Sequence, residues 1–158
     1  MTTIAVDANG LVCADTQLTS DNYALRVCKL FRMANGGVIS GSGVWFSAYA
    51  WIQWHLAGEM GERPTLARGT EIVMVNPDGS ILVAEGDGPA FPLLDKTIAL
   101  GCGRDIARAA LARGLTALEA VAEAVQLDNY SSEPLQSMQT LTPTELPGVD
   151  TYTKRKRK

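Results

Sequence analysis

The fold is decided at residues 2–15, which read TTIAVDANGLVCAD. Residues 2–8 carry an alternating pattern of apolar side chains that predicts a β-strand. Asn9-Gly10 then supplies the dipeptide that favours a tight hairpin turn, and residues 11–15 form a second, mostly apolar run. This stretch therefore predicts an antiparallel hairpin.

Further strands follow along the chain. The turn Asn35-Gly36-Gly37 joins predicted strands at 27–33 and 38–41, and the turn at 76–79 joins predicted strands at 71–75 and 80–85. A short apolar run predicts a strand at 97–100, and a last strand is predicted at 135–141. Because hairpin connections make antiparallel neighbours, we expect antiparallel sheets.

Three helices are predicted between these strands, at 44–60, at 104–113 and from Thr116 onward. The third begins with a capping box, since Glu119 follows Thr116 by three residues. Helical spacing predicts one apolar stripe on the first helix and one on the third, made of Trp45, Tyr49, Ile52 and Leu56, and of Leu118, Val121, Ala122 and Val125. The elements together predict an α+β fold in which two antiparallel sheets stack and helices cover their outer faces.

Length and charge limit the possible functions. The chain has 158 residues, which suits one domain, and we expect that domain at 1–141 and a flexible tail with a basic end at 142–158. The net charge is −3, and removing the five consecutive cations at 154–158 leaves −8. An acidic body argues against a nucleic-acid partner.

The remaining composition predicts a cytoplasmic protein without a cofactor. No apolar stretch reaches the roughly 18 residues that span a membrane, and no basic, apolar leader is present. Cys13, Cys28 and Cys102 lack metal-site spacing, so neither a metal nor a disulfide is expected. His55 is the single histidine, so a histidine base for hydrolysis is not expected.

Thr2 is a candidate nucleophile. A small residue after Met1 permits removal of that methionine, which would leave a free α-amine on a residue that also carries a hydroxyl. The α-amine has a reference pKa of about 7.7–8.0, so a useful fraction is neutral near pH 7 and can act as a base. A nearby lysine would lower that pKa further.

Six landmarks occur in a characteristic order: TTIAV at 2–6, ADTQLT at 14–19, Lys29, GSG at 41–43, GCG at 101–103 and DNYSS at 128–132. Their order and spacing resemble the proteasome β-subunit and HslV-like family of N-terminal-nucleophile (Ntn) threonine peptidases. The resemblance extends over residues 2–141 and implies the four-layer αββα sandwich of that family, with two antiparallel sheets between helices.

The resemblance also implies catalytic roles. Thr2 would attack the peptide carbonyl, and Lys29 beside it would lower its effective pKa. Asp15 would pair with Lys29 and keep it charged and oriented. Gly43 would donate its backbone N–H to the oxyanion and so contact the substrate, with Gly41 as the alternative.

Further residues complete the implied site. Thr19 would lie on the strand edge that binds an extended substrate. Asp128 and Ser131 would form a hydrogen-bond network around the Thr2 amine, together with Cys102. The family has serine where this chain has Cys102, and glycine where it has Ser132.

These observations predict a threonine-type endopeptidase that works in a self-compartmentalising homo-oligomeric ring. Its substrates would be unfolded polypeptides, fed by an ATP-dependent unfoldase. Three alternatives stay open: a catalytically silent shell subunit, favoured by Cys102 and Ser132; an Ntn amidase acting on a small molecule; and a binding module whose basic tail docks on nucleic acid.

Overall fold

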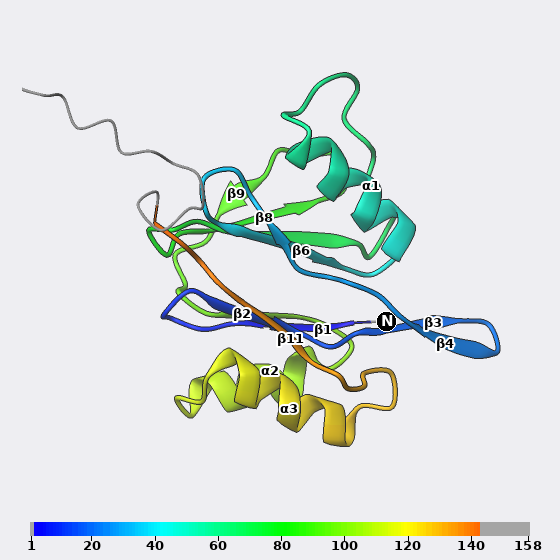
Figure 1. The fold of residues 1–158 in the computed structure, drawn as a ribbon, viewed down its shortest axis with the longest axis vertical. Helices are drawn as coiled ribbons and strands as arrows, with labels where there is room; N and C mark the ends of the chain where they lie inside the picture. The colour runs from blue at the N-terminus through cyan, green and yellow to red at the C-terminus, as the bar shows by residue number, and fades with distance from the viewer. Residues whose placement is uncertain (1, 143–158) are drawn as a thin grey trace, which may run out of the picture.

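The computed structural model describes residues 2–142, and within them it contains two larger antiparallel sheets and one projecting hairpin (Figure 1). The first sheet has the order β10-β1-β2-β11. Its strands are β1 (Thr3–Val6), β2 (Leu11–Ala14), β10 (Ile98–Gly101) and β11 (Gln136–Gln139). The hairpin predicted at residues 2–15 is confirmed: β1 pairs with β2, and Gly10 takes a positive φ of 77° in the turn between them.

The second sheet has the order β5-β6-β7-β8-β9. Its strands are β5 (Phe31–Arg32), β6 (Val38–Ser42), β7 (Glu71–Val75), β8 (Ile81–Glu85) and β9 (Phe91–Pro92). The hairpin at residues 71–85 is confirmed, with Gly79 N–H donating to the carbonyl of Asn76 at 2.9 Å. The projecting hairpin consists of β3 (Gln17–Ser20) and β4 (Tyr23–Arg26).

The helices lie on the outer faces of the two sheets, as Figure 1 shows. Helix α1 (Trp45–Leu56) packs on β6 and β7, whereas α2 (Arg104–Ala112) and α3 (Ala117–Leu127) pack on the first sheet. The capping box at Thr116 and Glu119 is confirmed, because each side chain bonds the other residue's backbone N–H. The observed architecture is therefore α+β, with antiparallel sheets and flanking helices.

Three apolar clusters hold these elements together. Ile4 and Val6 of β1 point toward the second sheet and meet Val73 and Val75 of β7, whereas Ala5 points the other way, toward α2 and α3. This division follows from the two-residue side-chain period of a strand. The third cluster packs α1 on the outer face of the second sheet. Each fully buried Val or Ile stabilises the fold by about 1.5–3 kcal/mol.

One strand is shorter than the sequence predicts, and one hairpin was not predicted. Residues 27–30 do not join the strand predicted at 27–33, of which β5 keeps only Phe31–Arg32. Side chains replace the strand ladder there: Lys29 N–H donates to Gln136 Oε1 at 2.8 Å, and Ser40 Oγ donates to the Lys29 carbonyl at 2.7 Å. The β3–β4 hairpin was not predicted as a hairpin at all.

The predicted helix faces are also wrong in part. Helix α1 ends at Leu56 rather than at 60, before Gly58 with its positive φ of 88°. Tyr49 is 44% exposed, and the buried residues of α1 are Ser47, Ala48, Trp51 and Ile52. On α3, Leu118 is 44% exposed, and the buried stripe is Ala117, Ala120, Val121 and Ala124. Small alanines let α3 approach the sheet and α2 closely, so they face inward instead of the larger leucine.

Candidate active site

A fully buried ion pair lies behind the start of β1. Asp15 follows β2 directly, Lys29 lies between β4 and β5, and both side chains are 0% exposed. Lys29 Nζ contacts Asp15 Oδ1 at 2.8 Å and also donates to the carbonyl of Gln17 at 2.6 Å. The structure thus brings together the two charged residues that the sequence placed in one site.

Backbone amides surround the carboxylate of this pair. Asp15 Oδ1 accepts from Thr3 N–H at 2.9 Å, and Oδ2 accepts from Gln17 N–H at 3.0 Å and from Ser132 N–H at 3.3 Å. Burial lowers the pKa of Lys29 below its ordinary value, and Asp15 works in the opposite direction. A buried charge is tolerated only when it is paired and hydrogen-bonded, which describes Asp15.

Thr2 directly precedes β1, at the end of the first sheet where β1 meets β10. It is 3% exposed, and its carbonyl accepts a hydrogen bond from Cys102 N–H at 2.8 Å. Gly101, with a φ of 89°, presses on this carbonyl so closely that a Cβ there would lie 1.6 Å from the oxygen. The turn at 101–103 therefore fixes the backbone of Thr2.

A chain of hydrogen bonds runs beside Thr2 through its neighbour Thr3. Gly103 N–H donates to Thr3 Oγ1 at 3.0 Å, Thr3 Oγ1 and Ser131 Oγ are 2.6 Å apart, and Ser131 Oγ donates to Asp128 Oδ2 at 2.6 Å. Because the one hydroxyl hydrogen of Ser131 goes to Asp128, Thr3 is the donor to Ser131. The chain ends on the Asp128 carboxylate.

The thiol of Cys102 joins the same carboxylate. Cys102 Sγ donates to Asp128 Oδ2 at 2.9 Å and lies 3.4 Å from the Thr2 carbonyl oxygen. Burial and the Asp128 carboxylate raise the pKa of Cys102, so the thiol stays protonated at neutral pH. Burial alone would raise the pKa of Asp128, but the hydrogen bonds from Cys102 and Ser131 outweigh it and lower that pKa.

A cleft of about 190 Å³ opens in front of Thr2. Its lining residues are Thr2, Ser42, Gly43, Gly69, Glu71, Gly101, Cys102 and Arg104. Gly43 takes a φ of 95°, and a Cβ there would lie 2.3 Å from the Gly69 carbonyl oxygen. Gly41, by contrast, pairs with Ile72 inside the second sheet and packs under Ala48. Of the two candidate glycines, Gly43 is the one beside Thr2.

Thr19 does not lie in this cleft. It pairs with Ala24 in the β3–β4 hairpin, and its hydroxyl accepts from Gln17 Nε2 at 3.0 Å. The sequence also missed two residues of the site. Thr3 contributes a hydroxyl to the hydrogen-bond chain, and the sequence indicates this only by the pair of threonines at 2–3. Gln136 accepts a hydrogen bond from the backbone N–H of Lys29, and nothing in the sequence around Gln136 indicates this.

The described residues contain neither a candidate metal site nor a candidate membrane helix. Within residues 2–142, no group of three or more His, Cys, Asp or Glu side chains is placed to hold a metal ion. In the same range no helix is long and apolar enough to cross a bilayer. Thr2, Gly43 and Cys102 line the cleft, whereas Lys29 and Asp128 are not among its lining residues.

Solved structures share this fold. Thiobacillus denitrificans BPH in complex with epoxomicin matches with a TM-score of 0.62 and 16% identity, over 89% of this chain and 100% of its own. A second structure of that BPH matches with a TM-score of 0.59 and 17% identity, over 89% and 99%. Eukaryotic HslV from Trypanosoma brucei matches with a TM-score of 0.62 and 21% identity, over 87% and 98%.

These likenesses show that the chain has an HslV-like fold. No protein-family model matches the sequence, and no curated protein matches it either. At these identities the likenesses show the fold alone.

Proposed function

We propose that this chain is a threonine-type endopeptidase of the Ntn class, built as the four-layer αββα sandwich of that class. The observation that carries the proposal is the position of Thr2. It lines a cleft, and the residue after it donates its N–H to the carboxylate that also binds the buried Lys29. The HslV-like fold and its match to a BPH structure with bound epoxomicin add support.

The proposed reaction begins when Met1 is removed. Thr2 Oγ1 attacks the substrate carbonyl carbon, and the hydroxyl proton passes to the new α-amine, directly or through a water. The C–N bond then breaks, the proton goes to the leaving amine, and an ester remains on Thr2. Water hydrolyses that ester by the reverse proton path.

The surrounding residues support these steps. Gly43 N–H would stabilise the oxyanion, a contribution of about 2.7–4 kcal/mol for one such donor. The Lys29 ammonium disfavours a second positive charge nearby, so it would keep the Thr2 amine neutral and basic. Asp128, through Ser131 and Cys102, would orient the start of the chain.

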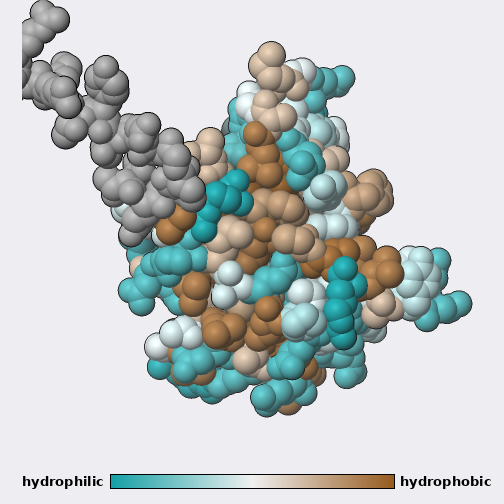
Figure 2. Space-filling view, viewed as in Figure 1, coloured by the Kyte–Doolittle hydropathy of each residue, from teal (hydrophilic) through white to brown (hydrophobic). Residues whose placement is uncertain are grey.

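We further propose a homo-oligomeric ring that encloses the sites and receives unfolded polypeptides from an ATP-dependent unfoldase. Large apolar side chains at the surface support self-association: Phe46 on α1 is 78% exposed, and Tyr23 on β4 is 59% exposed. Figure 2 shows hydrophobic residues gathered where the hairpin leaves the body. A native mass of a monomer or dimer would instead favour the small-molecule amidase.

A silent shell subunit is the second candidate, and one observation favours it. The thiol of Cys102 stands where the family that this sequence resembles has a hydroxyl, and a thiol is the weaker hydrogen-bond donor. Retention of Met1 on the purified protein would decide for that candidate.

Hydrolysis of an unfolded polypeptide by variants at Thr2 tests the proposal. Thr2→Ala should lower kcat by at least about 10³-fold, because the nucleophilic oxygen is gone. Thr2→Ser is the matched control, since it keeps the hydroxyl and should retain measurable turnover. Full activity of Thr2→Ala would refute the assignment of the nucleophile.

A further inference from the structure

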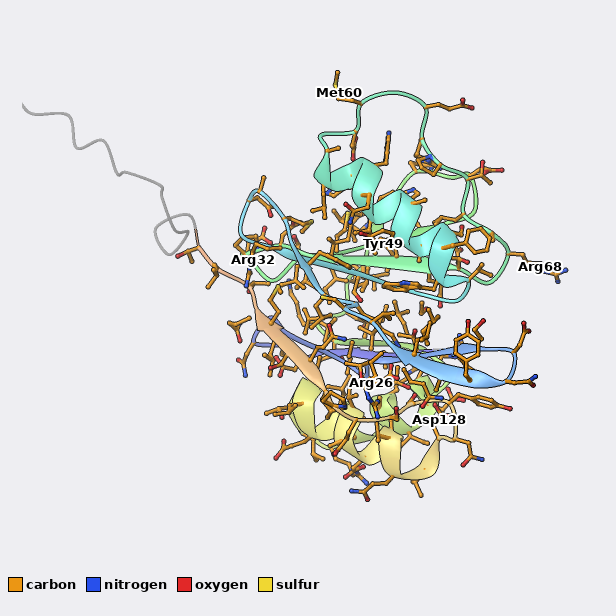
Figure 3. All side chains as sticks on the ribbon, turned by 45° about the vertical axis from the view of Figure 1, so that its right-hand side comes forward. Arg26, Arg32, Tyr49, Met60, Arg68 and Asp128 are labelled. Carbon is orange, nitrogen blue, oxygen red and sulfur yellow. The ribbon has the colours of Figure 1, made fainter. Side chains whose placement is uncertain are left out.

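The β3–β4 hairpin is connected to the loop at 128–134 by one arginine. Arg26, the last residue of β4, donates from Nη1 to Ser132 Oγ at 3.1 Å and also to the carbonyl of Glu133. In Figure 3 Arg26 and Asp128 lie on the same side of the molecule, Arg26 at the base of the hairpin and Asp128 at the end of α3. An exposed side chain thus directs its donors at protein acceptors.

Ser132 is held through three of its polar groups. Its N–H donates to Asp15 Oδ2 at 3.3 Å, its carbonyl accepts from Thr16 N–H at 3.4 Å, and its hydroxyl accepts from Arg26. The two backbone bonds are long, near the limit for N–H···O bonds. The hydroxyl bond to Arg26 is the one that glycine, expected here from the family resemblance, could not make.

Ser131, directly before Ser132, is the middle member of the hydrogen-bond chain beside Thr2. Its hydroxyl has to lie within 2.6 Å of both Thr3 Oγ1 and Asp128 Oδ2. A small displacement of the loop lengthens both contacts, and hydrogen bonds weaken steeply with distance and angle.

We infer that Arg26 is a positioning residue: by binding Ser132 and Glu133 it holds the Ser131 loop in place, so that the hairpin controls the geometry of the Thr2 site. The catalytic consequence rests on the proposed function. Because the loop contacts the start of β1 and is not among the residues lining the cleft, loss of Arg26 acts on turnover and leaves substrate binding unchanged.

Peptide hydrolysis by Arg26→Met and Arg26→Lys tests the inference. Arg26→Met should lower kcat about tenfold and leave KM within twofold. Arg26→Lys, whose ammonium can still reach one acceptor, should recover part of that loss. Arg108→Met is the matched control, because it removes an exposed arginine from α2 outside the Thr2 cleft and should leave both constants unchanged.

Ser132→Ala separates the specific bond from a general effect on folding. Alone it should lower kcat by about two- to fivefold, and combined with Arg26→Met it should add little, because both changes remove the same contact. Losses that multiply in the double variant, or a kcat for Arg26→Met within twofold of the wild type, would overturn the inference.

Hydrogen exchange keeps the test independent of activity. Arg26→Met should speed amide exchange at residues 128–133 and leave the exchange of α1 unchanged, whether or not the protein hydrolyses peptides. If the wild type is inactive but this local effect is present, the proposed function fails and the positioning contact stands. Unchanged exchange in the loop would overturn the contact itself.

Discussion

Asp15 and Lys29 form the most deeply buried ion pair among residues 2–142. Both are excluded from water, and each depends on the other. Removing one partner of such a pair leaves an uncompensated buried charge, which is far more destabilising than exchanging both partners for neutral groups.

Asp15→Asn should therefore lower the free energy of unfolding by about 3–5 kcal/mol, because Lys29 loses its counter-charge. Urea denaturation measures this change. Asp15→Asn combined with Lys29→Met should recover part of the loss, and the exposed Asp95→Asn should change stability by less than about 0.5 kcal/mol. A loss under 1 kcal/mol for Asp15→Asn would contradict the buried pair.

The Asp128 carboxylate controls the reactivity of Cys102. It raises the pKa of that thiol, together with burial, so Asp128→Asn should lower the pKa. Below the pKa, each unit of decrease gives ten times more thiolate, and the thiolate is the reactive form. Alkylation of Cys102 at pH 8 should therefore speed up several-fold in Asp128→Asn.

Mass spectrometry of peptides measures that rate, with two cysteines of the same chain as references. The exposed Cys28 reports the activity of the reagent. Cys13 should not react in the folded protein, because it is buried and burial raises its pKa to about 12. An alkylation rate at Cys102 that is unchanged or slower would contradict the hydrogen bond to Asp128.

At the scale of elements, the end of β10 fixes the position of Thr2 in the fold. Gly101 closes the β1–β10 pairing opposite Thr3, and its positive φ leads into the turn before α2. The same residue presses on the Thr2 carbonyl. The position of the proposed nucleophile is thus set by a strand almost a hundred residues later.

Gly101→Ala should be strongly destabilising and should abolish activity, because the new Cβ would occupy the place of the Thr2 carbonyl oxygen. Gly114→Ala is the matched control, since Gly114 has a similar φ of 85° with no atom within 4 Å of a Cβ. That control should lose only about 1–2 kcal/mol of stability, because alanine is strained at a left-handed φ. Equal losses for the two variants in thermal unfolding would contradict the close approach.

Local signals predicted most elements correctly. Asn9-Gly10, the turn at 76–79 and the capping box at Thr116 each act through neighbouring residues, and each is confirmed. The β3–β4 hairpin escaped prediction because residues 17–26 lack a clear alternation and a Gly-containing turn. Residues 27–30 look like a strand, but the N–H of Lys29 and the carbonyl of Val27 bond the side chain of Gln136, more than a hundred residues later.

The sequence predicted most residues of the candidate site, but it did not predict the contacts that hold them in place. The resemblance selected Asp15, Lys29, Cys102, Asp128 and Ser131, which the structure places next to the start of β1; their catalytic roles stay predictions. Thr19 lies on β3 of the projecting hairpin and not in the cleft, and its contact with a substrate stays a prediction. The contact from Arg26 to the 128–134 loop joins residues more than a hundred positions apart, so no local pattern could indicate it.

At the scale of the whole molecule, the layers place the proposed site at an edge between the two sheets. The first sheet supplies Thr2 and the turn at 101–103, and the second sheet supplies Gly43 at the start of α1. Figure 1 shows the start of β1 at this side, next to the β3–β4 hairpin. A site assembled from both sheets requires the complete fold, and the cleft that Thr2 lines lies between them.

The most direct test of the account is the intact mass of the purified protein after incubation with a peptide epoxyketone such as epoxomicin. We expect a chain that lacks Met1 and carries one inhibitor, with no adduct on Thr2→Ala. A chain that retains Met1 and carries no adduct would contradict it and would indicate a silent subunit.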